Sequence, residues 1–94
     1  MRLRYKEWAM PELEENDLIF FNPTENKGRW SQVFGNDNPI HLEIGAGKGK
    51  FATVMSQLNP DINFIAVEME AGAFVYASRL FSESGQTNIR GIKT

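Results

Sequence analysis

The stretch 40–51 reads IHLEIGAGKGKF, and its residue types and spacing suit the binding of a charged ligand. Glu43 stands two residues before Gly45, and Gly47 and Gly49 follow at alternate positions. Glycines in a turn let backbone N–H groups approach a ligand without interference from Cβ atoms, and they tolerate positive φ. The pattern therefore predicts a ligand-binding turn with a carboxylate beside it.

The spacing of the glycines separates three classes of ligand. A phosphate-binding P-loop needs Gly-Lys followed by Ser or Thr, but Lys48 is followed by Gly49 and Lys50 by Phe51, so this class is excluded. A dinucleotide fingerprint, G-x-G-x-x-G, needs a third glycine where the chain has Lys50. The glycines here are one residue closer together, and a dinucleotide-binding domain stays as a distant alternative.

The third pattern, E-x-G-x-G-x-G, suits S-adenosylmethionine, which carries an ammonium, a carboxylate and a sulfonium but no phosphate. Side chains alternate along a strand, so Glu43 and Gly45 share one side, where a carboxylate can attract the ammonium. Glu68 follows the apolar run 63–67, at the point where an acid can accept hydrogen bonds from ribose hydroxyls. Met69 either flanks the adenine or packs internally. We expect Glu43 and Glu68 to flank one hollow at the turn.

These residues need a parallel sheet to position them. Apolar runs predict strands at 40–44, 63–67 and, more weakly, 88–92. Apolar residues at helical spacing predict two intervening helices, and the second should end at Gly85. The helix markers are Phe51, Val54, Met55 and Leu58, and then Phe74, Ala77, Ser78 and Phe81. Right-handed crossovers in this β-α-β-α-β order give strands in the spatial order 3-2-1, which is half of a doubly wound α/β fold.

The amino-terminal part has a different character. Residues 1–27 are predicted to be an irregular arm, because Pro11 and Pro23 interrupt them and FFNPTENKG is rich in turn formers. A short helix should follow near residues 30–34, with its aromatic side chains packed against the core. The remaining range, 28–94, is expected to form a truncated Rossmann-like half-domain for S-adenosylmethionine.

Composition limits the classes of function. The chain has 94 residues, 41% hydrophobic and 23% charged, with a formal net charge of −2. The absence of cysteine excludes disulfides, cysteine-ligated metals and thiol catalysis, and we predict no metal site. No apolar run approaches the ~18 residues of a membrane span, which favours a cytoplasmic protein. Near-neutral charge still permits a local basic patch.

The run NKGRWSQVFGNDNPIHLEIGAGKGKF, followed by NPDINFIAVEME, resembles the bacterial tRNA (guanine-N7)-methyltransferases. The opening MRLRYKEWA is similar to the amino-terminal arm of that family. This resemblance implies a class I methyltransferase fold, S-adenosylmethionine as methyl donor, and N7 of a guanine in the tRNA variable loop as acceptor. It implies cofactor contacts from Glu43 and Glu68, with Gly45 and Gly47 in the turn. The residues of the arm with an implied tRNA contact are Arg2, Arg4 and Lys6.

The family pattern also continues past the position of Thr94, with an aspartate that contacts the adenine and a segment similar to Asp-Pro-Trp-Pro-Lys-Lys-Arg-His. No catalytic residue is therefore assigned here, and we expect His41 to be a packed strand residue rather than a general base. We expect weak cofactor binding, no activity of this chain alone, and self-association through the exposed strand 40–44. The alternative is a binding or assembly module without turnover.

Overall fold

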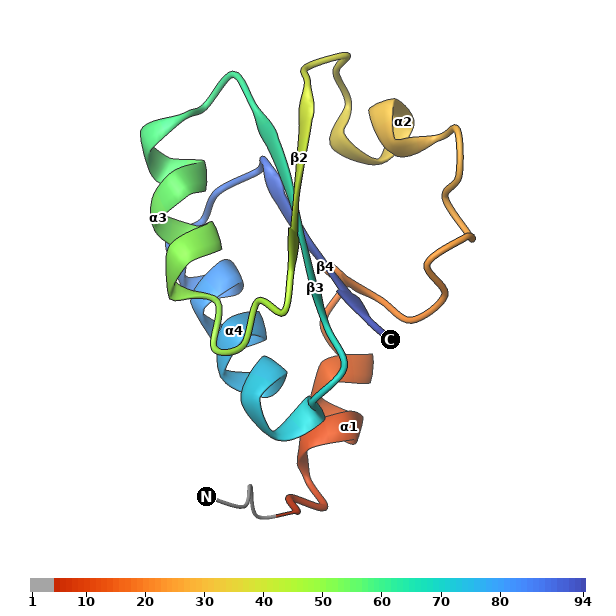
Figure 1. Cartoon of the computed structure of the whole chain (residues 1–94), viewed down its shortest axis with the longest axis vertical. Helices are drawn as coiled ribbons and strands as arrows, with labels where there is room; N and C mark the ends of the chain where they lie inside the picture. The colour runs from red at the N-terminus through yellow and green to blue at the C-terminus, as the bar shows by residue number, and fades with distance from the viewer. Residues whose placement is uncertain (1–4) are drawn as a thin grey trace.

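A four-stranded parallel sheet organises the chain in the computed structural model, which describes residues 5–94 (Figure 1). The strands are β1 (Ile19–Phe20), β2 (Ile40–Ile44), β3 (Asn63–Glu68) and β4 (Ile89–Lys93). Their spatial order is β1-β4-β3-β2, and every neighbouring pair is parallel. The predicted order of the three longer strands is confirmed, and β1 adds a short fourth strand beyond β4.

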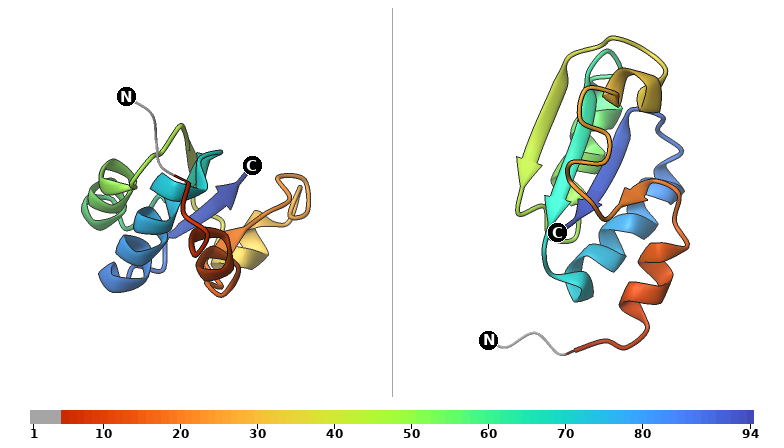
Figure 2. Two further views of the ribbon diagram at one scale, coloured as in Figure 1. Left: turned by 90° about the horizontal axis from the view of Figure 1, so that it is seen from below. Right: turned by 90° about the vertical axis from the view of Figure 1, so that its right-hand side faces the viewer.

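Helices lie on both faces of this sheet (Figures 1 and 2). The helices are α1 (Ala9–Glu14), α2 (Trp30–Phe34), α3 (Lys50–Leu58) and α4 (Ala71–Ser84). Helices α3 and α4 pack on one face, where α1 lies against α4, and α2 lies on the opposite face. The order of strands and helices from β2 to β4 is the predicted β-α-β-α-β.

The larger of two apolar cores lies between the sheet and the α3–α4 layer. Phe74 and Phe81 of α4 are fully buried there and pack edge to face, with ring centroids 6.2 Å apart. Phe64, Ala66 and Ile89 point into this core from the strands. The smaller core lies under α2, where Phe34 and Trp30 pack with strand residues as predicted. The predicted helices α2 and α4 are therefore confirmed together with their buried faces.

The prediction that residues 1–27 are irregular is wrong for α1 and β1. Pro11 lies in the first turn of α1, where backbone N–H groups have no partner inside the helix, so it does not interrupt the helix. Ala9 and Leu13 are spaced four residues apart and are buried in the main core, where α1 packs on α4. The residue-28 domain boundary stays a prediction, and Arg2 and Arg4 lie outside the described residues.

Helix α3 forms where predicted, but it buries the other face. Its large apolar side chains Phe51, Val54 and Leu58 are exposed, whereas the small residues Ala52, Thr53 and Ser56 are buried. Small residues let α3 approach α4 and the sheet closely. A Cβ on Gly49, just before the helix, would lie only 2.6 Å from the Cβ of Ala77.

Candidate functional site

The glycine turn joins β2 to α3 and is tied to the end of β3. The backbone N–H groups of Gly45 and Ala46 both donate to the Val67 carbonyl, at 2.8 and 3.0 Å. The N–H of Gly47 donates to Oε1 of Glu68 at 2.8 Å. The turn is thereby fixed at the carboxyl edge of the sheet, where parallel α/β folds bind their ligands.

Backbone conformation demands glycine in this turn, and the space over it is free. Gly45 has φ +76° and Gly47 has φ +58°, in the left-handed region that side-chain-bearing residues rarely adopt. A Cβ at either position would meet no other atom within 4 Å. These two positions therefore present bare backbone to open space rather than to the protein's own side chains.

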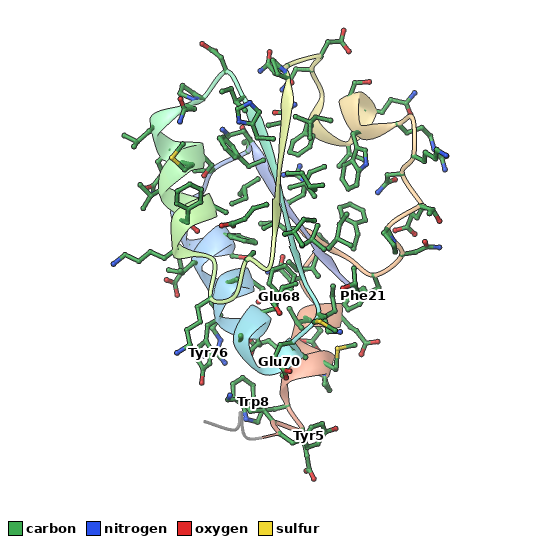
Figure 3. The ribbon with its side chains drawn as sticks, in the orientation of Figure 1. Tyr5, Trp8, Phe21, Glu68, Glu70 and Tyr76 are labelled. Atoms are coloured by element: carbon green, nitrogen blue, oxygen red, sulfur yellow. The ribbon has the colours of Figure 1, made fainter. Side chains whose placement is uncertain are left out.

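Glu68 is the residue that connects the turn to the next helix (Figure 3). Its Oε1 accepts the hydrogen bond from Gly47, and its Oε2 accepts one from the backbone N–H of Glu70 at 2.9 Å. A carboxylate has roughly four acceptor sites, so each oxygen can still accept a further hydrogen bond. Glu68 can thus hold the turn and also contact a ligand.

A small hollow lies beside Glu68 at the ends of β2 and β3, with a volume of about 140 Å³. Met69 is 75% exposed at its rim and is free to contact a ligand. The lining residues are Ile44, Gly45, Val67, Glu68, Met69 and Thr94. Complete small-molecule pockets have roughly 300–1,000 Å³, so these residues accommodate only part of a nucleoside-sized ligand.

Glu43 does not share this hollow, which differs from the expectation. It lies opposite Ala66 in the strand register and lines a separate hollow of about 180 Å³, together with Phe51 and Met55 of α3. Its Oε1 is buried and has no hydrogen-bond partner among the described residues. Desolvation raises the pKa of the Glu43 carboxyl. The structure thus brings Gly45, Glu68 and Met69 together and holds Glu43 in an adjoining hollow.

His41 is not the packed residue that the sequence suggested. Its side chain is exposed, because β2 has no further strand on its outer edge in the described part of the chain. Its ring contacts Phe64 edge to face, with centroids 5.6 Å apart. The residue is thus a surface aromatic contact at the sheet edge.

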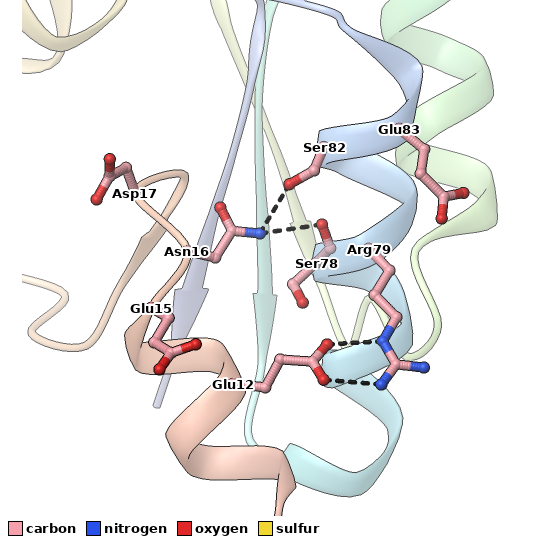
Figure 4. Close-up of a pocket in the computed structure, with 8 residues that line it drawn as sticks. All are labelled: Glu12, Glu15, Asn16, Asp17, Ser78, Arg79, Ser82 and Glu83. Carbon is pink, nitrogen blue, oxygen red and sulfur yellow. Dashed lines mark hydrogen bonds and ion pairs between the residues drawn. The ribbon is translucent and has the colours of Figure 1, made fainter.

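Another hollow, of about 490 Å³, lies between α1 and α4 (Figure 4). Here Glu12 accepts two hydrogen bonds from Arg79, at 2.6 and 2.7 Å, and these bonds lower the pKa of the Glu12 carboxyl. The Asn16 amide donates to the Ser78 carbonyl and the Ser82 hydroxyl. Because these polar groups satisfy one another, this hollow is a seam that joins two helices.

Basic side chains that the sequence analysis did not connect gather on the other side of the glycine turn. Lys6 and Lys48 both lie over the Tyr76 ring, with Nζ 5.5 and 5.6 Å from its centroid. Lys48 and Lys50 served only as evidence against the P-loop and dinucleotide patterns, and no role was assigned to Tyr76. The sequence signal for this basic cluster was the pair of lysines, Lys48 and Lys50, that alternates with the glycines of the turn.

Residues 5–94 contain neither a metal-binding cluster nor a helix that could span a membrane. No cluster of three or more histidine, aspartate or glutamate side chains there is arranged to hold a metal ion. None of the helices in this part of the chain has the length and apolar character needed to cross a bilayer.

Taken together, the parallel sheet and glycine turn define a Rossmann-like α/β fold of the methyltransferase class. The solved structure of phosphoethanolamine N-methyltransferase 2 from Haemonchus contortus, in complex with S-adenosyl-L-methionine, superposes with a TM-score of 0.54. The superposition covers 99% of this chain and 23% of that one, at 15% sequence identity, and so shows the fold.

Comparison with protein-family models and with known sequences identifies the family of the chain. The family described as "Putative methyltransferase" matches residues 37–94, and the chain belongs to that family. A tRNA (guanine-N(7)-)-methyltransferase of Bacillus velezensis is 48% identical over 91 residues, which is 96% of this chain and 42% of the relative. The protein of that name from Desulfitobacterium hafniense is 45% identical over 92 residues, 98% and 43% respectively. The chain thus spans less than half the length of these relatives.

Proposed function

We propose that this chain is the cofactor-binding part of an S-adenosylmethionine-dependent methyltransferase that acts on N7 of guanine in tRNA. The observation that carries the proposal is the hydrogen bond from Gly47 to Glu68, which places a carboxylate beside a Cβ-free turn at the carboxyl edge of the sheet. The names of the curated relatives support the reaction and the acceptor. The cofactor in the H. contortus structure supports the methyl donor.

The described residues fit this cofactor in four respects. Bare backbone at Gly45 and Gly47 accepts a ligand without steric conflict, and Glu68 keeps acceptor capacity for ribose hydroxyls. Met69 is exposed at the rim, where it can flank an adenine. In the adjoining hollow, Glu43 offers a buried acceptor that has no partner among the described residues, which suits a cationic group such as the methionine ammonium.

The chemistry asks little acid–base work of this part of the protein. S-adenosylmethionine supplies a methyl group on a sulfonium, and N7 of guanine is already a nucleophile. Alignment of the base with the methyl group therefore matters more than proton transfer. We assign no catalytic residue among residues 5–94. A tRNA substrate also places the protein in the cytoplasm.

Substitution of Glu68 tests the cofactor site. Glu68→Gln should weaken S-adenosylmethionine binding several-fold, because the amide cannot accept hydrogen bonds from both of its terminal atoms. We expect a dissociation constant on the order of 1 mM for the 94-residue chain, which saturation-transfer NMR can measure. Glu70→Gln is the matched control, since the Glu70 side chain is not part of the proposed site. Tighter binding of NAD than of S-adenosylmethionine would instead support the dinucleotide alternative.

A transfer assay separates the enzyme from a module without turnover. The chain is mixed with tRNA and methyl-labelled S-adenosylmethionine, alone and with the carboxyl-terminal part of a relative supplied in trans. We expect labelled 7-methylguanine only in the complemented mixture. No label in either mixture, with cofactor binding intact, would favour the binding or assembly module.

We also propose that two copies of the 94-residue chain associate through β2. The strand pairs only with β3 among the described strands, and Ile40, Leu42 and Ile44 are 43%, 59% and 72% exposed along it. A free apolar strand edge is a template for pairing. Leu42→Lys should therefore convert a dimer to a monomer in light scattering, whereas Leu58→Lys on α3 should not. A wild-type monomer at high concentration would contradict this pairing.

A further inference from the structure

The hollow on the other side of the glycine turn is the strongest unassigned feature of the molecule. It has a volume of about 540 Å³ and lies between the glycine turn, one side of α4 and the segment before α1. Its basic lining residues are Lys6, Lys48, Lys50 and Arg79. The whole chain has 10 lysines and arginines and a net charge of −2, so four cations around one hollow are a marked local excess.

Tyr76 organises these cations. Lys6 and Lys48 place their ammonium groups 5.5 and 5.6 Å from the centroid of its ring. Such cation–π contacts hold ammonium groups without neutralising them. Lys6 also donates to the Gly72 carbonyl at 3.3 Å, and this bond keeps its charge as well. The ring therefore fixes two positive charges that stay available to an anion.

The carboxylates near this hollow do not cancel that charge. Glu12 is engaged by Arg79 in the seam between α1 and α4. Glu83 is the acidic residue in the lining, opposed by three lysines outside that pair. Like charges gathered in one concavity repel one another unless an anion binds there, so the geometry favours an anionic ligand.

The proposed cofactor does not account for this hollow, because its one anionic group is a single carboxylate, whereas three lysines outside the Arg79–Glu12 pair line the hollow. The hollow nevertheless begins at Lys48, one residue beyond the Gly47 that bonds Glu68. Both sites thus lie at the carboxyl edge of the sheet, on two sides of one turn. An RNA that brings a base toward the Glu68 side can place a backbone phosphate on the lysine side.

We propose that Lys6, Lys48 and Lys50, arranged around Tyr76, form a binding site for a backbone phosphate of the RNA substrate. This inference rests on the proposed tRNA methyltransferase function. Phosphate contacts of this kind position an RNA and add affinity without reading its sequence.

Fluorescence anisotropy with a labelled, unmodified tRNA transcript tests the site on the 94-residue chain. Lys48→Gln/Lys50→Gln should lower affinity about 10-fold, and it should make the slope of log K against log salt shallower by roughly 1.5, as expected for two lost lysine–phosphate contacts. The control Lys27→Gln/Arg29→Gln removes the same charge from the loop before α2 and should change affinity less than about 2-fold. Thermal melts verify that both variants fold.

Three results would overturn the proposal: equal affinities of the two double variants, no RNA binding by the wild-type chain at low salt, or displacement of the RNA by equimolar inorganic phosphate. The last result would mark a site for a free anion. Cofactor titration of the same samples keeps the two proposals separate. Unchanged cofactor binding with reduced RNA affinity supports both, whereas RNA binding without any cofactor binding contradicts only the proposed methyltransferase.

Discussion

The sheet has a covered end, formed by β1 and β4, and an open end, formed by β2. Both ends contain apolar strand residues, but they differ in how these residues are covered. Strand β4 lies between β1 and β3, with α4 on one face and α2 on the other, and Ile89 and Ile92 are buried. Among the strands that the structure describes, β2 pairs with β3 alone, and its apolar residues Ile40, Leu42 and Ile44 are exposed. An apolar run thus indicates a strand, but the neighbours of that strand determine whether it is buried.

Apolar side chains are exposed on α3 as well as on β2. Phe51, Val54 and Leu58 are exposed on that helix, so both elements that flank the glycine turn present apolar side chains to solvent. The covered end contains the fully buried Phe74, and the open end contains the glycine turn of the candidate site. We therefore expect substitutions at the covered end to change stability, and substitutions at the open end to change binding and association.

Two phenylalanines provide the largest test of this contrast. Phe74→Ala at the covered end should lower the free energy of unfolding by about 3–5 kcal/mol, because it leaves a cavity in the main core. Phe51→Ala at the open end should change it by only about 0.5 kcal/mol, since Phe51 is already largely exposed. Urea unfolding followed by circular dichroism measures both. Equal losses would show that the α3 surface is covered in solution.

A substitution that adds volume to the core, at a glycine of β4, should lower stability by a smaller amount than Phe74→Ala. A Cβ on Gly91 would lie 2.7 Å from both Ile19 and Phe74, so Gly91→Ala should cost about 1–3 kcal/mol through overpacking. The φ of Gly91 is not positive, which leaves steric conflict as the cause. Ile19→Val in the Gly91→Ala background should recover part of the loss, as a double-mutant cycle of urea melts can measure. A fully additive cycle would contradict this contact.

The covered end was also the harder one to predict from sequence. The longer strands, their order and α4 follow from apolar runs and helical spacing, which local sequence determines. Strand β1 has only two residues, and α1 contains a proline, so both depend on tertiary contacts with β4 and α4. The prediction of which face of α3 is buried was wrong for the same reason. The close approach of α3 to α4 favours small side chains on the buried face, and this approach is a tertiary contact.

The parts of the candidate site that local sequence determines were predictable. Gly45, Gly47 and Glu68 follow from the turn pattern and the end of a strand, and hydrogen bonds join Gly47 to Glu68 and Gly45 to the neighbouring Val67. The separate hollow that Glu43 lines was not predictable, because Phe51 and Met55 of α3 form it by packing near β2. The cluster around Tyr76 likewise depends on α4 and on a segment more than 60 residues away in sequence.

The smallest expected effect on stability comes from Glu43, on the face of β2 that lies toward α3. It is seen only when the stability of the chain is compared at different pH values. Burial raises the pKa of Glu43, so the folded chain favours its protonated carboxyl. At low pH both folded and unfolded chains are protonated there, and the residue adds no charge penalty. As pH rises from the unfolded pKa through the raised folded pKa, the folded chain acquires a desolvated charge and loses stability relative to the unfolded chain.

Glu43→Gln should therefore stabilise the chain slightly at about pH 7 and leave it nearly unchanged at about pH 3.5. Urea melts at the two pH values measure this difference, and equal effects at both would assign the change to packing instead of charge. A gain at neutral pH only would mean that β2 is incompletely satisfied on both faces, with apolar side chains in solvent on one and an unpaired carboxylate on the other. Strand β4 has neither deficit, so the cost in stability falls on the open strand, beside the candidate site.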